Sequence, residues 1–261
     1  MLSEAITGAK EISDARRSRY EIPSNVHVCV TAEGSVLLDL RQDKYFGLGR
    51  GDTEILAAAV TAWPMPSWPC ELHLERESNE LCSSMVELGL LARSRENVNP
   101  AGDQRRRGKA LPKDMRGEWI SIGDELEVRS PISTWHSANF ISAYLWARWS
   151  LAWRPFIVTV DRVRARKAKC RDDAQPLSVS EVSAIVDVFR KLRPFVFAAE
   201  GRCLLHALTL VRFFSKYAFY PDWVIGVTTQ PWGAHSWVQW GDFLLDTNPE
   251  KVCAYTPILV I

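Results

Sequence analysis

The chain has 261 residues, of which 47% are hydrophobic, so it can bury a core and wholesale disorder is excluded. Its formal net charge is +1, but residues 1–100 carry 10 Lys and Arg against 15 Asp and Glu, whereas residues 101–261 carry 22 against 16. This asymmetry predicts two domains with different electrostatics.

The start of the chain lacks the apolar stretch of a signal peptide, and no apolar run approaches the roughly 18 residues of a membrane span. The cysteines are widely spread and form neither a Cys-x-x-Cys pair nor a zinc-type cluster with histidine. We therefore expect a cytoplasmic protein without a membrane partner, in which most cysteines are small core residues. The six are Cys29, Cys70, Cys82, Cys170, Cys203 and Cys253.

The N-terminal half predicts a small α+β domain over residues 22–93, preceded by a polar arm over residues 1–21. Alternating apolar residues and turn signals predict three successive strands, at 26–30, 35–40 and 44–48. Asp52, Thr53 and Glu54 predict the cap of a helix that runs to about Ala62. A second helix is predicted over 78–88, ending at Gly89.

Residues 94–117 are polar and interrupted by glycine and proline, which predicts a linker before a second domain over 118–261. Trp146, Trp149 and Trp153 recur at helical spacing within 138–153, so we expect them to pack in the core. The basic run 162–171 indicates a solvated helix face, with contact to an acidic peptide or a nucleotide phosphate as the alternative. Another amphipathic helix is predicted over 178–192.

Cys203 follows Gly201 and Arg202 and precedes apolar residues at helical spacing, so it is predicted in the first turn of a helix. A thiol reacts as a thiolate, which a helix N-terminus and a nearby imidazolium both favour. Free amide groups of that turn can also stabilise an oxyanion. Cys203 is therefore a candidate nucleophile, although a single cysteine in a core is more often a packing residue.

A predicted hairpin supplies the partners of this nucleophile. Gly241 and Asp242 form a two-residue turn, which places His235 and Asp246 on one face of the sheet as diagonal neighbours about 7–8 Å apart. An aspartate there can accept the imidazole N–H and orient the ring. Asn248 is the alternative orienting residue, and His206, one helical turn after Cys203, is the alternative base.

In this combination the residues resemble a known family. The run from Arg202 to Leu208, the segment from Ala234 to Val238 and Asp246 are similar to the transglutaminase-like leader peptidase of lasso peptide biosynthesis, the B protein. The segments 36–41 and 45–48 resemble the PqqD-like element that recognises precursor peptides. His206 departs from this resemblance, since an arginine is expected at that position.

The resemblance implies a winged-helix-like, PqqD-like N-terminal domain followed by a transglutaminase-like or papain-like α+β cysteine peptidase domain. It implies a Cys203, His235 and Asp246 triad that cuts a precursor at its leader–core junction. It also implies that the leader binds as an added strand. The implied leader-binding residues are Lys44, Tyr45, Phe46, Gly47 and Leu48 on the third strand, with Glu80, Ser84 and Glu87 on the helix.

The implied partners are the precursor peptide and an ATP-dependent, asparagine-synthetase-like cyclase that closes a macrolactam on the freed amine. The chain has no P-loop motif and no metal motif, so no cofactor bound by a recognisable motif is expected, and any use of ATP rests with the cyclase or with a site that the sequence does not reveal. Two other functions stay open. One is an amide-crosslinking transglutaminase with the same chemistry. The other is a non-catalytic winged-helix binder, although the acidic N-terminal half disfavours nucleic acid.

Overall fold

The computed structural model describes residues 20–68, 75–94, 119–122, 130–170, 177–196 and 201–261. The predicted arm up to residue 19 and nearly all of the predicted linker lie outside the described residues. Two compact units are found, one made of Met1–Leu37 and Phe46–Arg106 and the other of Leu38–Tyr45 and Arg107–Ile261. The predicted domain boundaries stay predictions, because the linker itself is not described.

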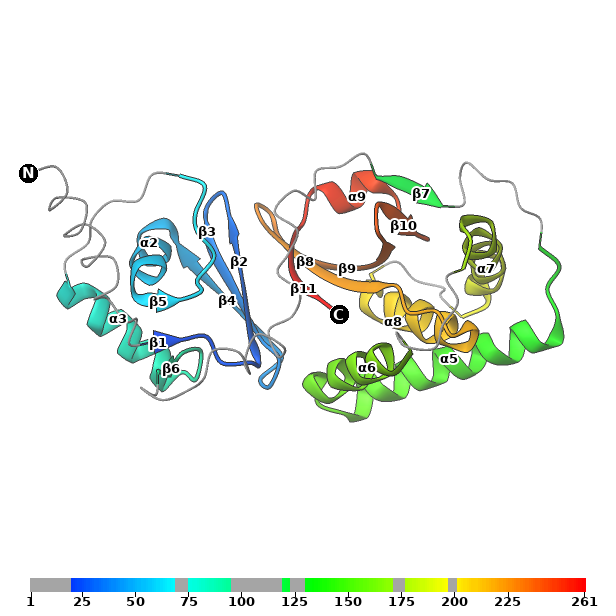
Figure 1. The fold of residues 1–261 in the computed structure, drawn as a ribbon, viewed down its shortest axis with the longest axis horizontal. Coiled ribbons are helices and arrows are strands. Elements are labelled where there is room, and N and C mark those ends of the chain that lie inside the picture. Colours follow the sequence, from blue (N-terminus) through cyan, green and yellow to red (C-terminus); the bar gives the residue numbers. More distant parts are fainter. Residues whose placement is uncertain (1–19, 69–74, 95–118, 123–129, 171–176, 197–200) are drawn as a thin grey trace, which may run out of the picture. The chain divides into compact units, whose positions relative to one another are not determined.

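The described residues within 20–94 form two small sheets and two helices, and the three strands predicted there are confirmed (Figure 1). One sheet has the order β2-β3-β4 and the other β5-β1-β6. Tyr20, predicted as part of the polar arm, is instead buried in β1, where it pairs with Val60 and Arg93. The elements are β1 (Tyr20–Glu21), β2 (Val26–Thr31), β3 (Gly34–Asp39), β4 (Lys44–Gly49), α2 (Arg50–Ala59), β5 (Val60–Thr61), α3 (Glu75–Glu87) and β6 (Ala92–Arg93).

The predicted cap of α2 is wrong, because the helix begins earlier, with Gly49 as its N-cap. Thr53 is buried and serves the core instead. Its Oγ1 donates to the carbonyl oxygen of Gly49 at 2.8 Å and lies 2.8 Å from the hydroxyl of Ser35 on β3. The predicted end of α3 is confirmed, since Gly89 adopts a left-handed conformation with φ of 74°.

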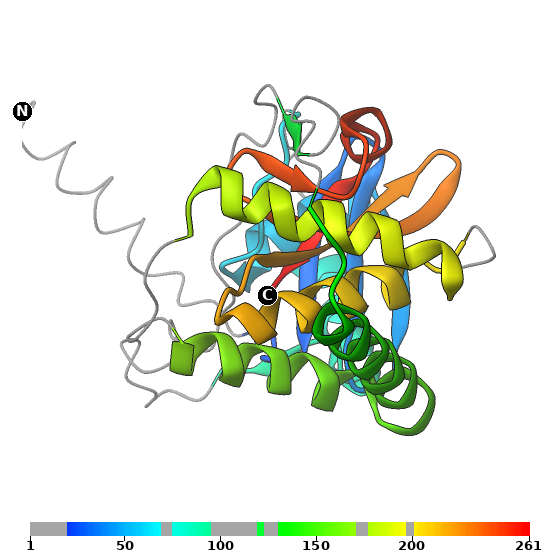
Figure 2. The same cartoon turned by 90° about the vertical axis from the view of Figure 1, so that its right-hand side faces the viewer.

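The second unit is a five-stranded sheet with helices packed against it, in the strand order β11-β8-β9-β10-β7. Helix α8 lies between the sheet and α5 (Figures 1 and 2). The elements are β7 (Ile120–Ile122), α5 (Thr134–Trp153), α6 (Phe156–Cys170), α7 (Val179–Leu192), η1 (Arg193–Phe195), α8 (Cys203–Phe214), η2 (Ser215–Tyr217), β8 (Asp222–Thr229), β9 (Trp232–Trp240), β10 (Phe243–Leu245), α9 (Pro249–Cys253) and β11 (Thr256–Val260).

The tryptophans of α5 do not form the core face that their spacing predicts. Trp149 is 47% exposed and Trp153 is 78% exposed. The buried face of α5 consists of Phe140, Ala143, Ala147 and Ser150, whose mostly small side chains allow α8 to approach closely. Among the described helices, α5 included, none is both long and apolar enough to cross a membrane.

The basic run on α6 is partly used for internal contacts. Lys167 forms an ion pair with Asp222 at the start of β8. The Arg166 guanidinium lies 5.2 Å from the ring centre of Trp146 on α5, a cation–π contact. These residues therefore attach α6 to its neighbours within the unit.

Candidate active site

Cys203 is the first residue of α8, as predicted, and its side chain is half-buried. Gly201 enters the helix with φ of 98°, a conformation that favours glycine, and the N-cap Arg202 makes no side-chain capping bond. The first-turn amide groups of α8 therefore have no side-chain cap. This arrangement suits the stabilisation of negative charge at Cys203.

A cavity of about 510 Å³ brings the predicted catalytic residues together. Its lining includes Cys203 and His206 from α8, His235 from β9, and Asp246 directly after β10. Cys203 and His206 are three residues apart, so they lie on the same face of α8. The structure thus gathers both candidate bases around one candidate nucleophile.

The predicted two-residue turn is confirmed, with Gly241 at φ of 56°, and the strands pair from Phe243 opposite Trp240 to Leu245 opposite Val238. On the other side of β9, His235 pairs with Gly226 of β8. The absence of a side chain at Gly226 is required, because an added Cβ would lie 2.7 Å from the Trp237 ring. Because residue 226 is glycine, the Trp237 ring can lie over β8 next to His235.

The imidazole of His235 is held by aromatic rings. It stacks on Trp237, with ring centres 6.1 Å apart and an interplanar angle of 20°, and lies 5.2 Å from the ring centre of Tyr255. Its Nε2 is buried and has no hydrogen-bond partner among the described residues. The ring is thus positioned by packing, with one nitrogen unused.

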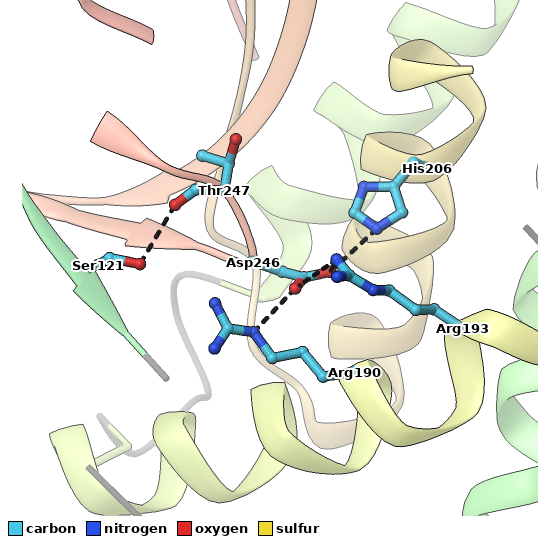
Figure 3. A network of polar contacts seen from close by, with 6 residues as sticks. All are labelled: Ser121, Arg190, Arg193, His206, Asp246 and Thr247. Carbon is cyan, nitrogen blue, oxygen red and sulfur yellow. Dashed lines mark hydrogen bonds and ion pairs between the residues drawn. The ribbon is translucent and has the colours of Figure 1, made fainter. Parts of the chain in front are cut away.

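Asp246 is the most heavily contacted polar residue of the cavity (Figure 3). Arg190 Nε donates to its Oδ1 at 2.8 Å, and Arg193 Nη1 donates to Oδ1 and Oδ2 at 2.8 and 2.9 Å. His206 Nε2 lies 2.9 Å from Oδ2. The side chain of Asp246 is 1% exposed, so these groups replace water around its charge.

The histidine for which the structure gives a contact with Asp246 is His206, the alternative base. Strand pairing of β10 ends at Leu245, opposite Val238. Asp246 then adopts a left-handed conformation with φ of 59°, so the diagonal pairing expected from a continued strand does not form. The role of Asp246 as the residue that orients His235 stays a prediction.

Asn248, the alternative orienting residue, has another task. Its Oδ1 accepts a hydrogen bond from the Glu250 amide at 2.8 Å and so caps α9. The chain has left the sheet before this point, because strand pairing ends at Leu245, so Asn248 does not lie opposite His235 in the sheet.

Burial alone raises the pKa of the Asp246 carboxyl. The hydrogen bond and charge of His206, together with the charges of Arg193 and Arg190, outweigh burial and hold the pKa below its usual range. Asp246 is therefore a carboxylate at neutral pH.

We expect His235 to titrate below pH 6.5. Its burial, and then the charges of Lys251 and His206, lower the pKa of the imidazole from 6.5. The ring is thus neutral at pH 7 and able to accept a proton. NMR titration of isotope-labelled histidine, assigned with His235→Gln, measures this pKa. Lys251→Met should raise it, whereas Lys169→Met, on the exposed end of α6, should leave it unchanged; a midpoint above 6.5 in the wild type contradicts the expectation.

The predicted leader-binding residues lie on two elements of the N-terminal half. Lys44 to Leu48 all belong to β4, which is an edge strand of its sheet. Phe46 and Leu48 are partly buried against the core. Glu80, Ser84 and Glu87 are exposed on α3, and their spacing of four and three residues places them on one face of the helix.

Reasoning from the sequence missed the cationic residues of the site. Arg190 and Arg193 lie at the end of α7 and in η1, which the sequence marked only as a helix closing before Pro194. Lys251 lies on α9, a short helix that was not predicted. Basic residues at a helix end are common, so the sequence carried no signal that these side chains meet a carboxylate.

Within the described residues, no group of three or more His, Cys, Asp or Glu side chains could hold a metal ion. The cavity chemistry is instead that of a thiol, two imidazoles, one carboxylate and several cations. These groups fit nucleophilic acyl transfer, in which a thiol attacks a carbonyl carbon and an imidazole moves the proton.

Comparison with known proteins agrees with this chemistry. Residues 142–260 match the family model of the Transglutaminase-like superfamily, so the C-terminal part of the chain carries a transglutaminase-like domain. Such a domain is compatible with a cysteine peptidase or an acyltransferase. No curated protein and no solved structure matches the chain.

Proposed function

We propose that this chain, with its transglutaminase-like domain, is a cysteine peptidase that cleaves a ribosomally made lasso peptide precursor between leader and core. The observation that carries the proposal is the cavity in which Cys203, at the first turn of α8, lies with His235 and Asp246. The same thiol and imidazole chemistry serves all peptidases that form a thioester intermediate.

In the proposed reaction, neutral His235 takes the thiol proton and the sulfur of Cys203 attacks the scissile carbonyl carbon. The first-turn amides of α8 stabilise the oxyanion. The C–N bond then breaks, and His235 returns the proton to the leaving amine, which becomes the new N-terminus of the core. Water attacks the remaining thioester and releases the leader as a carboxylate, with the thiol restored.

His206 is the second candidate base, favoured by its 2.9 Å approach to Asp246. A histidine paired with a buried carboxylate is the usual arrangement of an oriented base. His235→Gln and His206→Gln distinguish the two. The variant that removes the base loses thioester formation, while the other retains it at a reduced rate.

We assign leader recognition to the N-terminal half. An edge strand has unpaired backbone groups that an extended peptide can complete, and β4 is such a strand. In this proposal the leader adds as a strand beside Lys44 to Leu48, and the exposed face of α3 with Glu80, Ser84 and Glu87 contacts its side chains. Binding the leader holds the scissile bond near Cys203 at high effective concentration.

The proposed partners are the precursor and an ATP-dependent, asparagine-synthetase-like cyclase, acting together in the cytoplasm. The cyclase consumes the core whose amine this protein frees. Cleavage itself needs no nucleotide in this scheme, because a thioester forms and hydrolyses without added energy.

The test uses a short precursor encoded beside this gene, incubated with the full chain in H₂¹⁸O, with and without cyclase and ATP. We expect two fragments, with one ¹⁸O in the new carboxylate of the leader. A core peptide without its leader is the matched substrate control and should be cleaved far more slowly. No cleavage of the precursor under any of these conditions contradicts the proposal.

The transglutaminase-like domain also fits an amide-crosslinking transglutaminase, in which an amine replaces water as the acceptor. The same experiment with an added amine donor separates the two. A joined product without ¹⁸O identifies a crosslinker.

A further inference from the structure

A second cavity, of about 320 Å³, adjoins the active-site cavity. The two share four lining residues, so they form one continuous site. Those residues are Arg193, Asp246, Thr247 and Lys251. A group bound in the second cavity is therefore within reach of a substrate at Cys203.

The charge balance of this site is positive. Arg193, Arg202 and Lys251 line the active-site cavity, and Asp246 is the only carboxylate among its described lining residues. That carboxylate is already satisfied by Arg190, Arg193 and His206. The remaining positive charge has no counterpart within the described part of the site.

Lys251 is the centre of this excess charge. Its side chain is exposed and makes no hydrogen bond or ion pair with any described residue. Arg193 Nη1 donates to both oxygens of Asp246, and the Arg193 side chain is still 43% exposed. Three cations, Arg190, Arg193 and Lys251, thus line the second cavity, and Asp246 is the only carboxylate among its described lining residues.

The backbone around Lys251 is held in place. The Thr247 carbonyl accepts a hydrogen bond from the Ser121 hydroxyl at 3.2 Å (Figure 3). Asn248 caps α9. Lys251 also influences the candidate catalytic region. Burial is the largest cause that lowers the pKa of His235, and the charge of Lys251 is the next largest. A cation held at this position acts on any group bound beside Cys203.

We propose that Lys251 and Arg193 form an anion-binding subsite that holds a carboxylate of the peptide substrate beside Cys203. The proposal rests on the proposed function, because the carboxylate belongs to the peptide being cleaved. Two cations at one cavity offset the cost of removing a carboxylate from water. The subsite therefore selects an acidic residue close to the scissile bond. Free inorganic phosphate is the other source of such an anion.

Alkylation of Cys203 tests the subsite without any peptide substrate. Iodoacetate carries a carboxylate and iodoacetamide does not, so the ratio of their rates at Cys203 measures attraction of the anion. Differences in thiol reactivity cancel in this ratio. We expect Lys251→Met to lower the ratio about three- to tenfold, measured by peptide mapping in a Cys253→Ser background.

The matched control is Lys169→Met, an exposed lysine outside both cavities, which should leave the ratio unchanged. An equal ratio in the two variants overturns the proposal. Glutarate should slow iodoacetate at Cys203 in the wild type and not in Lys251→Met. If phosphate slows the reaction of iodoacetate with Cys203 and glutarate does not, the assignment to a peptide carboxylate is overturned.

The outcome is separable from that of the proposed function. If Lys251→Met lowers the iodoacetate-to-iodoacetamide ratio as expected but the protein cleaves no precursor, the anion-binding subsite is supported and the peptidase function is contradicted. Precursor cleavage that is equally fast in Lys251→Met, with no change in the ratio, overturns the subsite and leaves the peptidase.

Discussion

Replacing Cys203 with alanine is expected to abolish cleavage of the precursor, with a loss of about 10³-fold or more. In the proposed reaction the sulfur is the atom that forms the thioester, and the described lining residues of the cavity include no other thiol. Alanine favours helices, and the half-buried side chain leaves only a small void at the start of α8. The measurement is product formation by mass spectrometry at equal protein concentration.

Leader binding should survive in Cys203→Ala, because the proposed recognition elements β4 and α3 lie in the other half of the chain. Isothermal titration with the leader alone checks this. Cys253→Ala is the matched control, since Cys253 is exposed on α9 outside the cavity lining and its loss should leave cleavage unchanged. Cleavage by Cys203→Ala at close to the wild-type rate would remove the proposed mechanism altogether.

Replacing Asp246 with asparagine is expected to destabilise the second unit by about 2–4 kcal/mol at pH 7. The change leaves Arg190, Arg193 and His206 around a buried position without a compensating charge. This expected loss in the free energy of unfolding is smaller than for breaking a fully buried ion pair, because the Arg193 side chain is 43% exposed and partly screened by water. Urea unfolding at pH 7 gives the difference in the free energy of unfolding.

The effect should depend on pH in a defined direction. The pKa of Asp246 is lower in the folded protein than in the unfolded chain, where it is about 3.9. Its contribution is therefore fully present above that value and is lost as the pH falls through the folded-state pKa. The stabilities of the wild type and Asp246→Asn should begin to converge as the pH falls below about 4 and should become equal only below the folded-state pKa.

Asp242→Asn is the control for this measurement. Asp242 is an exposed carboxylate in the same hairpin, and its replacement should change stability by less than about 0.5 kcal/mol. Equal stability of Asp242→Asn and Asp246→Asn at pH 7 would show that the arginine contacts contribute nothing. If His206→Gln lowers activity as much as Asp246→Asn does, Asp246 acts through His206.

Local patterns predicted several elements of the site correctly. The start of α8 at Cys203 and the two-residue turn before Phe243 depend on neighbouring residues only. Glycine, capping residues and alternation determine such features within a few residues. These parts of the candidate site were therefore predictable without any knowledge of the fold.

Other expectations were wrong where packing between elements distant in the sequence determines which side chains are buried. The spacing of Trp149 and Trp153 on α5 suggested a core face, yet the neighbouring face with Ala143 and Ala147 meets α8. Periodicity shows that a helix has a distinct face, but close approach of two helices favours small residues over large ones. Hydrophobicity alone selected the wrong side.

The sequence by itself determined the place of the candidate nucleophile at a helix start, the candidate histidine on a strand and the hairpin that follows it. Only the tertiary structure decided which partner Asp246 takes. The strand ends one residue before Asp246, and a left-handed residue directs the carboxylate toward Arg190, Arg193 and His206. These partners lie about 40 to 56 positions away along the chain. Contacts over such separations depend on how the helices pack against the sheet, which no local pattern records.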